Sequence, residues 1–286
     1  MIFKSANTNL NIKEATAFVT FPILEAYKSL RHGFSTRLGG VSKNEFKSMN
    51  FRFFGNETRD NILENYCRFS RAIGVEFKDL ISVHQVHGDQ IQVIEDKDRG
   101  TASAIYRQER PIYDADGLVT AHSDLALVTY HADCTPIFFF DPIKKVIGLV
   151  HSGFKGTAKG IAFKMINKMC AEFSCKEQDI ICVIGPAISQ DCYEVDDVVY
   201  EEFKEMPWVI NSSFIKSKKG QTKGNENKYM LCLKTANKEI LKRAGVKSSN
   251  IYMSDLCTYK CSDMFFSHRA MGDNRGVMIA VMCMKF

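Results

Sequence analysis

Short apolar blocks dominate the hydrophobic pattern of this chain, and most of them have the length of a β-strand. Blocks of this size that are bounded by Gly, Pro, Asn or Asp are typical of strands. The pattern predicts single extended segments at residues 17–24, 144–153, 179–189, 250–259 and 275–286. It predicts two strands within residues 117–141. Within 32–56 and 80–96 it predicts extended pieces on either side of a turn, at Gly39-Gly40 and at residues 87–89 respectively.

Three other segments repeat apolar residues at intervals of three and four, which is the spacing of one helix face. The first covers residues 58–75, and Thr58 or Asn56 can cap its start. Its apolar positions are Ile62, Tyr66, Phe69 and Ile73. The same spacing predicts helices at residues 156–173 and 231–246.

Strands outnumber helices, and several strands follow one another without an intervening helix. This order disfavours a doubly wound parallel sheet. It predicts an α+β, mixed-sheet fold in which helices cover the sheets. The chain has no internal repeat and no Pro/Ser-rich linker, so we expect one domain over residues 1–286.

Composition and charge narrow the class of protein. The hydrophobic content of 45% is that of a globular protein, and the net charge of +5 is only mildly basic. The densest basic run, residues 216–228, also contains Gly, Asn and Gln, which favours a solvated loop over a nucleic-acid site. No apolar run reaches the roughly 18 residues of a membrane span, and the N-terminus does not resemble a signal peptide. We therefore expect a cytoplasmic protein.

The ten cysteines are scattered and lie mostly in apolar runs. With no export signal and a long chain, reduced thiols are expected rather than a disulfide framework. No CxxC occurs, and the CxxxC formed by Cys257 and Cys261 is a weak metal signal.

Three residues of the metal-binding or nucleophilic types share one local context. His87, Cys134 and His151 each come near the end of a strand-like run, beside the turn residues Gly88, Pro136 and Gly153 respectively. Strand ends that open into turns can bring polar side chains together in one pocket. Among the other histidines, His131 is close to Cys134 in the sequence and is the best candidate for a residue that contacts this ligand without binding the metal.

Two chemistries fit this set. Two imidazoles and one thiolate are suitable ligands for a zinc ion that keeps an open fourth position. Alternatively, Cys134 is a nucleophile with His151 or His87 as its base, and backbone N–H groups near Gly153 stabilise an oxyanion. Both need a thiolate close to an imidazole, so the sequence does not separate them.

Two basic residues beside turns are candidates for binding an anion. Gly153 and Gly156 enclose Lys155 where a predicted strand turns into a helix. Backbone N–H groups at such a turn, together with Lys155, can hold a phosphate. Arg37, which precedes the Gly39-Gly40 turn, is the second candidate.

Several motifs, in order along most of the chain, resemble one family. "STRLGGVS", "QVHG", "ADCTP", "HSGFKG" and "IGPAISQDCYEV" are similar to the family's STRxGGVS, QVHG, ADCLP, HAGWRG and IGPAIGPxxYEV, and "CTY" and "FFSHR" resemble its CTY and FFSYRR. The family is the YfiH type, which has been labelled multicopper polyphenol oxidase or laccase, purine nucleoside phosphorylase and peptidoglycan editing factor.

The resemblance implies a layered α/β/β/α fold of mixed sheets. It also implies zinc ligands at the His of QVHG, the Cys of ADC and the His of HAGWRG, which are His87, Cys134 and His151 here. The implied activity is phosphorolysis of adenosine, inosine, guanosine and methylthioadenosine, with deamination of adenosine to inosine. Phosphate would lie near Lys155 and Arg37, and Asp133 is either a proton donor or a structural hydrogen-bond acceptor.

Three of the departures from the family pattern put the roles of those positions in doubt, and other functions stay open. Phe154 and Lys155 stand where the family has Trp and Arg, and Ala270 replaces the second Arg of YRR. A hydrolase that edits a peptidoglycan precursor and a non-enzymatic, metal-dependent binding partner are the alternatives. A multicopper oxidase is disfavoured, because its copper centres need about ten His and the chain has seven. Adventitious copper could still give some oxidation.

Overall fold

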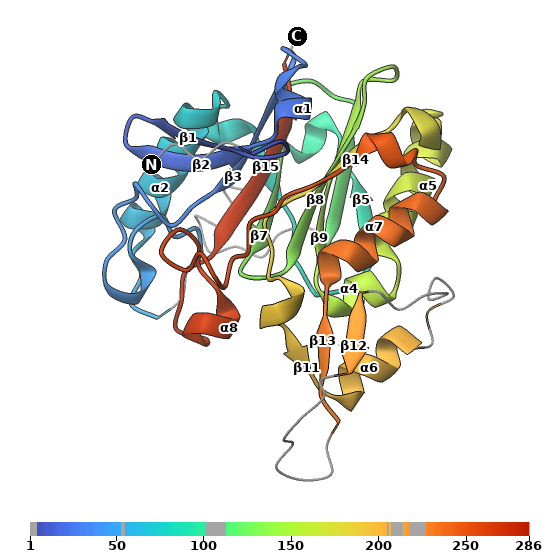
Figure 1. Cartoon of the computed structure of the whole chain (residues 1–286). Coiled ribbons are helices and arrows are strands. Elements are labelled where there is room, and N and C mark those ends of the chain that lie inside the picture. Colours follow the sequence, from blue (N-terminus) through green and yellow to red (C-terminus); the bar gives the residue numbers. More distant parts are fainter. Residues whose placement is uncertain are drawn as a thin grey trace.

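The computed structural model describes residues 5–52, 55–100, 113–204, 206, 214–217 and 227–285. Two large mixed sheets lie face to face, and helices cover their outer faces (Figure 1). The layers follow the order α/β/β/α, as the sequence predicts. Among the described residues, no helix is long and apolar enough to cross a membrane.

Each large sheet has six strands, and the chain passes repeatedly from one to the other. In order across the first sheet they are β1 (Asn9–Lys13), β2 (Thr16–Thr20), β3 (Leu30–Ser35), β15 (Met278–Met284), β7 (Ala126–His131) and β4 (Leu80–Ser82). Across the second they are β14 (Ile251–Met253), β10 (Ile181–Ile184), β8 (Thr135–Asp141), β9 (Val146–Ser152), β6 (Gly117–Thr120) and β5 (Ile91–Val93). The pairs β4/β7, β5/β6 and β10/β14 are parallel and the other pairs antiparallel.

The central strands are apolar on both faces because each face meets a different core. Successive side chains of a strand point to opposite faces. In β15, Met278, Ala280 and Met282 join the core between the sheets, whereas Ile279 and Val281 pack under the first sheet's helix. In β8, Phe138 and Phe140 face the core between the sheets, and Ile137 and Phe139 face the second sheet's helices.

The long helices cover the outer faces. On the first sheet lies α2 (Arg59–Ile73), which the Thr58 side chain caps by accepting a hydrogen bond from the Asn61 N–H and which ends at Gly74 in the left-handed conformation. On the second sheet α5 (Ile161–Phe173) packs on β9 and α7 (Leu233–Arg243) on β10. The short helices are α1 (Pro22–Glu25), α4 (Phe154–Ala158), α6 (Asp197–Lys204) and α8 (His268–Met271).

Several predicted boundaries were wrong. Residues 117–141 form three strands rather than two, because Asp124 and Asp133 adopt positive φ and turn the chain. The predicted helix 156–173 is broken at Gly160, whose φ is +72°, into α4 and α5. The predicted strand 17–24 ends at Thr20, and Pro22 begins α1.

A small third sheet and α6 were not predicted. The sheet consists of β11 (Glu194–Val195), β13 (Tyr229–Leu231) and β12 (Ile215–Ser217), and it projects with α6 below the second sheet in Figure 1. Strands of two or three residues carry no usable alternation. Of the basic run at 216–228, residues 218–226 lie outside the described part of the chain.

Candidate metal centre

The three candidate ligands converge where the chain passes from one sheet to the other. His87 lies on the connection from β4 in the first sheet to β5 in the second, and Cys134 lies on the turn from β7 to β8. His151 is near the end of β9, directly opposite Pro136 at the start of β8. The ends of adjacent strands thus bring together residues that are far apart in sequence.

One ligand atom from each of His87, Cys134 and His151 lies within 4.8 Å of the others. The two imidazole rings are perpendicular, with centroids 4.9 Å apart. His151 is buried, Cys134 is half-buried and His87 is exposed, so the cluster opens to solvent on the His87 side. Two nitrogens and one sulfur with an open side fit a three-ligand zinc site of the catalytic kind.

Asp116, which the sequence reading missed, ties two of these residues together. It immediately precedes β6 and is completely buried. Its Oδ1 accepts hydrogen bonds from His151 Nδ1 at 2.8 Å and from the His87 N–H at 3.1 Å, and its Oδ2 accepts from the Gly88 N–H at 2.7 Å. With His151 Nδ1 held by the carboxylate, the other ring nitrogen is left for a metal or for Cys134.

His131 supports the turn that carries Cys134 and is not one of the three cluster residues. Its Nδ1 lies 3.1 Å from the carbonyl oxygen of Cys134 and its Nε2 lies 2.8 Å from Thr129 Oγ1. A carbonyl oxygen only accepts, so Nδ1 donates and Nε2 accepts from the hydroxyl, which a neutral ring does. Burial, with His151 nearby, holds the pKa of His131 well below its usual value.

Charge in the metal-free cluster is shared between the thiol and the imidazoles. Burial alone would raise the pKa of Cys134, but His151 and His87 outweigh it and lower that pKa to about 6. Burial alone would lower the pKa of His151, but the Cys134 thiolate and Asp116 raise it to about 9. The pair is therefore stable as thiolate and imidazolium at neutral pH, and the thiolate is ready to bind a cation.

The backbone of Gly153 approaches the thiolate closely. An added Cβ at this residue, which precedes α4, would lie 3.2 Å from Cys134 Sγ and 3.5 Å from the His87 ring, so a side chain here would crowd the sulfur. The close approach of this backbone keeps the pocket narrow around the sulfur.

Asp133 is a hydrogen-bond acceptor in a structural network. Its carboxylate accepts from Thr258 Oγ1 at 2.6 Å, from Ser267 Oγ at 3.0 Å and from the Arg269 N–H at 2.7 Å. Its own backbone has φ of +87°, so the network stabilises a conformation that costs energy for a non-glycine residue. Of the two roles expected for Asp133, this geometry favours the structural one.

The two basic candidates occupy different surroundings. The Arg37 guanidinium donates to the carbonyl oxygens of Lys47 and Ser262, both at 2.9 Å, and lies over the Phe266 ring. Lys155 is exposed in α4, with Nζ 5.8 Å from the ring centroid of Phe154. The helix that was expected to begin at this turn spans only Phe154–Ala158. Within the described contacts, neither side chain touches the three cluster residues.

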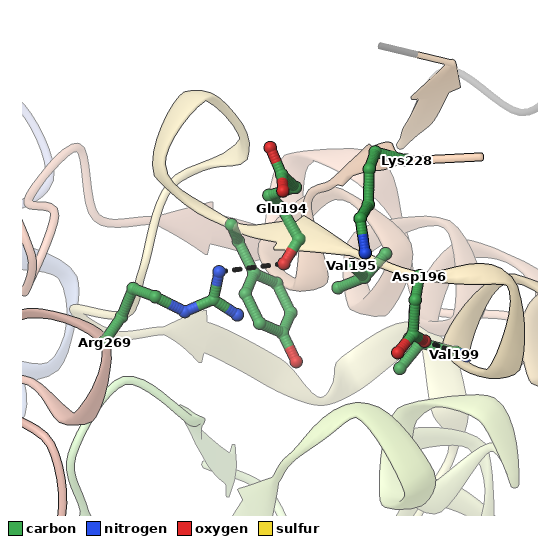
Figure 2. Close-up of a pocket in the computed structure, with 7 residues that line it drawn as sticks. Glu194, Val195, Asp196, Val199, Lys228 and Arg269 are labelled. Carbon is green, nitrogen blue, oxygen red and sulfur yellow. Dashed lines mark hydrogen bonds between the residues drawn. The ribbon is translucent and has the colours of Figure 1, made fainter. Parts of the chain in front are cut away.

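A hollow of about 200 Å³, lined by residues of β11 and α6 together with Tyr193, Lys228 and Arg269, was not predicted. Figure 2 shows Arg269 extended toward the Glu194 backbone, whose carbonyl it bonds at 2.8 Å, with Lys228 and Asp196 farther along the rim. Arg269 also covers the Tyr193 ring, at 5.1 Å from its centroid. Burial raises the pKa of Tyr193, and the charges of Cys134 and Asp133 add to this, which places the tyrosine near both groups.

Known proteins resemble this chain over almost its whole length. The family model described as "Multi-copper polyphenol oxidoreductase laccase" matches residues 31–285. "Purine nucleoside phosphorylase YlmD" of Bacillus subtilis is 31% identical over 285 residues, which is 100% of this chain and 94% of that protein. "Adenosine deaminase RL5", from an unknown prokaryotic organism, is 30% identical and covers 85% of this chain and 90% of its own length.

A solved structure agrees with the sequence relatives. The crystal structure of YlmD from Geobacillus stearothermophilus is similar with a TM-score of 0.86 and 30% identity, covering 97% of this chain and 99% of that one. The shared fold is the mixed α/β arrangement with two six-stranded mixed sheets. This chain belongs to the multi-copper polyphenol oxidoreductase laccase family, together with the YfiH and YlmD proteins.

Proposed function

We propose that this chain is a zinc-dependent purine nucleoside phosphorylase that also deaminates adenosine. The observation that carries the proposal is the His87–Cys134–His151 cluster, whose ligand atoms lie within 4.8 Å of one another in a full-length relative of purine nucleoside phosphorylases. The substrates would be adenosine, inosine, guanosine or methylthioadenosine, with phosphate. The deaminase part is supported by the similarity to the adenosine deaminase RL5.

The residues of the cluster fit a zinc ion by donor type, by spacing and by their supporting contacts. His87, Cys134 and His151 would hold it, and a bound zinc ion supplies Lewis-acid chemistry and lowers the pKa of water. Asp116 fixes the ring of His151, and Gly153 closes the backbone around Cys134. Ligands oriented in this way are a general feature of metal sites in enzymes.

The hollow lined by Tyr193 and Arg269 is the proposed place of the nucleoside and phosphate, because the charge of Cys134 acts on Tyr193. Arg269 donates one hydrogen bond to Glu194, and a guanidinium carries five N–H donors, so others can reach an anion. Lys155, which is exposed in α4, is the second proposed phosphate contact. We assign Arg37 to holding two loops together, because both its Nε and Nη1 are bonded to carbonyl oxygens.

Two other functions, a copper oxidase and a peptidoglycan-precursor hydrolase, have less support. Two His and one Cys account for one copper centre, and the remaining five of the seven histidines fall short of the about eight that an oxygen-reducing copper cluster needs. A hydrolase that edits peptidoglycan precursors would use the same cluster. Adenosine turnover separates it from the phosphorylase.

The test is chromatography of adenosine incubated with the zinc-loaded protein, with and without phosphate. We expect adenine and ribose 1-phosphate only with phosphate, and inosine in both conditions. Cys134→Ala should remove zinc and both products, whereas Cys67→Ala, a half-buried cysteine of α2, should keep them. Unchanged adenosine with zinc bound would reject the proposal and favour the precursor hydrolase, and full turnover by Cys134→Ala would reject the zinc site.

A further inference from the structure

A second group of cysteines lies outside the proposed metal centre. Cys257 follows β14 and forms an isolated parallel bridge with Ala187, and Cys192 lies in the short turn before β11. Cys192 Sγ lies 3.8 Å from Asp191 Oδ1, which also accepts from the Ser189 hydroxyl, and that hydroxyl lies 3.0 Å from the Cys257 sulfur, so the two thiols share one network. The CxxxC formed by Cys257 and Cys261 was only a weak metal signal in the sequence, and Cys192 comes from a different segment of the chain.

Hydrogen-bond donors surround the Cys257 sulfur. The Ser189 N–H donates to it at 3.2 Å, and the backbone N–H groups of Tyr259 and Lys260 help to lower the pKa of this thiol. The Ser189 hydroxyl lies 3.0 Å from the sulfur and also contacts the Asp191 carboxylate, so its single proton can serve either. Amide donors that converge on one sulfur stabilise its thiolate form.

Positive charge lies close to the same sulfur. Lys260 pairs with Asp191, and its ammonium is near both Cys192 and Cys257. Lys234 is buried, and its Nζ donates to the carbonyls of Ser254 and Leu256 just before Cys257. Burial would raise the pKa of Cys257, but the hydrogen bonds outweigh it and lower that pKa. Reactive cysteines typically have such surroundings, with cations and amide donors close to the thiolate.

A metal cage does not explain the group. Across the described ranges, three or more His, Cys, Asp or Glu ligand atoms come within 4.8 Å of one another only at His87, Cys134 and His151. A thiolate with one neighbouring thiol, and without a third ligand, is arranged for two-cysteine redox chemistry.

We propose that Cys257 and Cys192 form a redox-reactive pair that a small hydroperoxide converts to an intramolecular disulfide. The Cys257 thiolate attacks one peroxide oxygen, the O–O bond breaks and hydroxide leaves, which gives a sulfenic acid. Cys192 sulfur then attacks the Cys257 sulfur, the S–S bond forms, and the hydroxyl leaves as water with the Cys192 proton. Two thiols lose two electrons and the peroxide is reduced to two waters.

The size of the oxidant follows from burial. Cys257 is 5% exposed and Cys192 is half-buried, so a small peroxide reaches the pair more readily than a bulky disulfide. The pair also adjoins the network around the metal centre, because the Ile188 N–H and the Thr258 hydroxyl both bond to Asp133.

The chain contains its own matched control. Cys170 and Cys175 are neighbours as well, but Glu177 and Asp141 lie beside them. Burial and these carboxylates raise the pKa of Cys170 to about 11 and raise that of Cys175 too. Because neighbouring carboxylates disfavour the thiolate form, this second pair should stay reduced under the same treatment.

The test treats the reduced, zinc-loaded full chain with hydrogen peroxide, removes the excess with catalase and blocks free thiols. Cleavage before Asp191 and after Lys260 separates Cys192 from Cys182 and Cys257 from Cys261. Mass spectrometry without reductant should find a Cys192–Cys257 peptide that has lost two hydrogens and that dithiothreitol separates. In Cys192→Ser, dimedone should label Cys257 at least about tenfold more than Cys170.

Either of two kinds of result would contradict the proposal that Cys192 and Cys257 form a redox-reactive pair. One is a disulfide that joins Cys170 and Cys175 before Cys192 and Cys257, or no cross-link at all. The other is equal dimedone labelling of Cys257 and Cys170 in Cys192→Ser, which would show that the donors around Cys257 do not activate it. Cys192 is half-buried in a turn, so its replacement by Ser tests the chemistry without removing a core side chain.

Discussion

At the scale of single residues, the proposed metal centre is supported by one buried carboxylate, that of Asp116. The two carboxylate oxygens of Asp116 accept hydrogen bonds from four donors, which are the His151 ring and the N–H groups of Val86, His87 and Gly88. Burial alone would raise its pKa, but His151 and these N–H groups lower it, so Asp116 stays ionised. It therefore fixes both the ring of one ligand and the backbone of another.

Asp116→Asn should lower the affinity for zinc by about 10–100-fold. The new amide offers one acceptor oxygen, and its NH₂ group faces N–H donors that it cannot satisfy. Competition with a chromophoric zinc chelator measures the change. Asp114→Asn, at an exposed position two residues earlier, is the control and should bind zinc as the wild type does. An unchanged affinity in Asp116→Asn would remove the orienting role.

The charge of Cys134 predicts a pH profile for the metal-free protein. Because its pKa is lowered to about 6, its thiolate is populated above that pH, and the rate of alkylation by iodoacetamide should reach half of its plateau near pH 6. Burial and Glu64 raise the pKa of Cys67, which is also half-buried, so Cys67 should stay largely unreacted at pH 6.5. Peptide mapping reads both sites. Equal rates at Cys134 and Cys67 would contradict the proposed ion pair.

The three cluster residues could be identified in the sequence because each is a His or Cys beside a turn residue. The residues that orient them could not be identified in this way. His87, Cys134 and His151 come together as predicted. Asp116 stands between Ala115 and Gly117 with no motif around it, and only the folded sheet shows that it faces His151. The hollow beside Tyr193 is equally invisible, because residues more than seventy positions apart build it.

At the scale of elements, periodicity identified the long helices and central strands, and backbone conformation decided where they end. The cap and the apolar face of α2 follow from its sequence, and Thr58 does cap it. The break between α4 and α5 did not follow, since a glycine inside an apolar repeat can be tolerated in a helix. Before the break, α4 lies against the connection that carries His87, since an added Cβ at Gly156 would overlap the Gly88 carbonyl oxygen.

Gly156→Ala should test this contact between α4 and the His87 connection. An added Cβ would lie 2.7 Å from the carbonyl oxygen of Gly88, which is backbone and cannot move aside cheaply. Alanine would favour the helix by about 0.5–1 kcal/mol. The overlap should cost about 1–3 kcal/mol and outweigh that gain.

We expect Gly156→Ala to unfold at lower urea and to bind zinc more weakly, because the backbone next to His87 has to shift. Lys159→Ala, at an exposed position that follows α4, is the control and should change neither quantity. A variant that is as stable as the wild type and binds zinc equally well would show that the contact is not tight in solution.

At the scale of the whole molecule, the two sheets enclose a core that contains a histidine. His32 lies on β3, and its ring packs 5.7 Å from Phe21 and 6.4 Å from Phe138 of the opposite sheet, measured between centroids. Its Nε2 accepts a hydrogen bond from the Phe21 N–H at 2.9 Å, which only a neutral ring nitrogen can do. Burial lowers the pKa of His32 to about 3.

This histidine should make the stability of the fold depend on pH. In the unfolded chain its pKa is about 6.5, so the unfolded state takes up a proton as pH falls below that value while the folded state stays neutral. The contribution is complete above pH 6.5 and is lost progressively as pH falls toward 3. Between pH 7 and 5.5 the loss should be about 1 kcal/mol.

His32→Gln keeps an acceptor but does not titrate, so its free energy of unfolding should fall by about 1 kcal/mol less than that of the wild type over this range. Urea denaturation at both pH values measures the difference. His122→Gln, at an exposed position, should keep the wild-type loss. If His32→Gln lost as much stability as the wild type, the acid sensitivity of the fold would come from other groups, such as the buried His131.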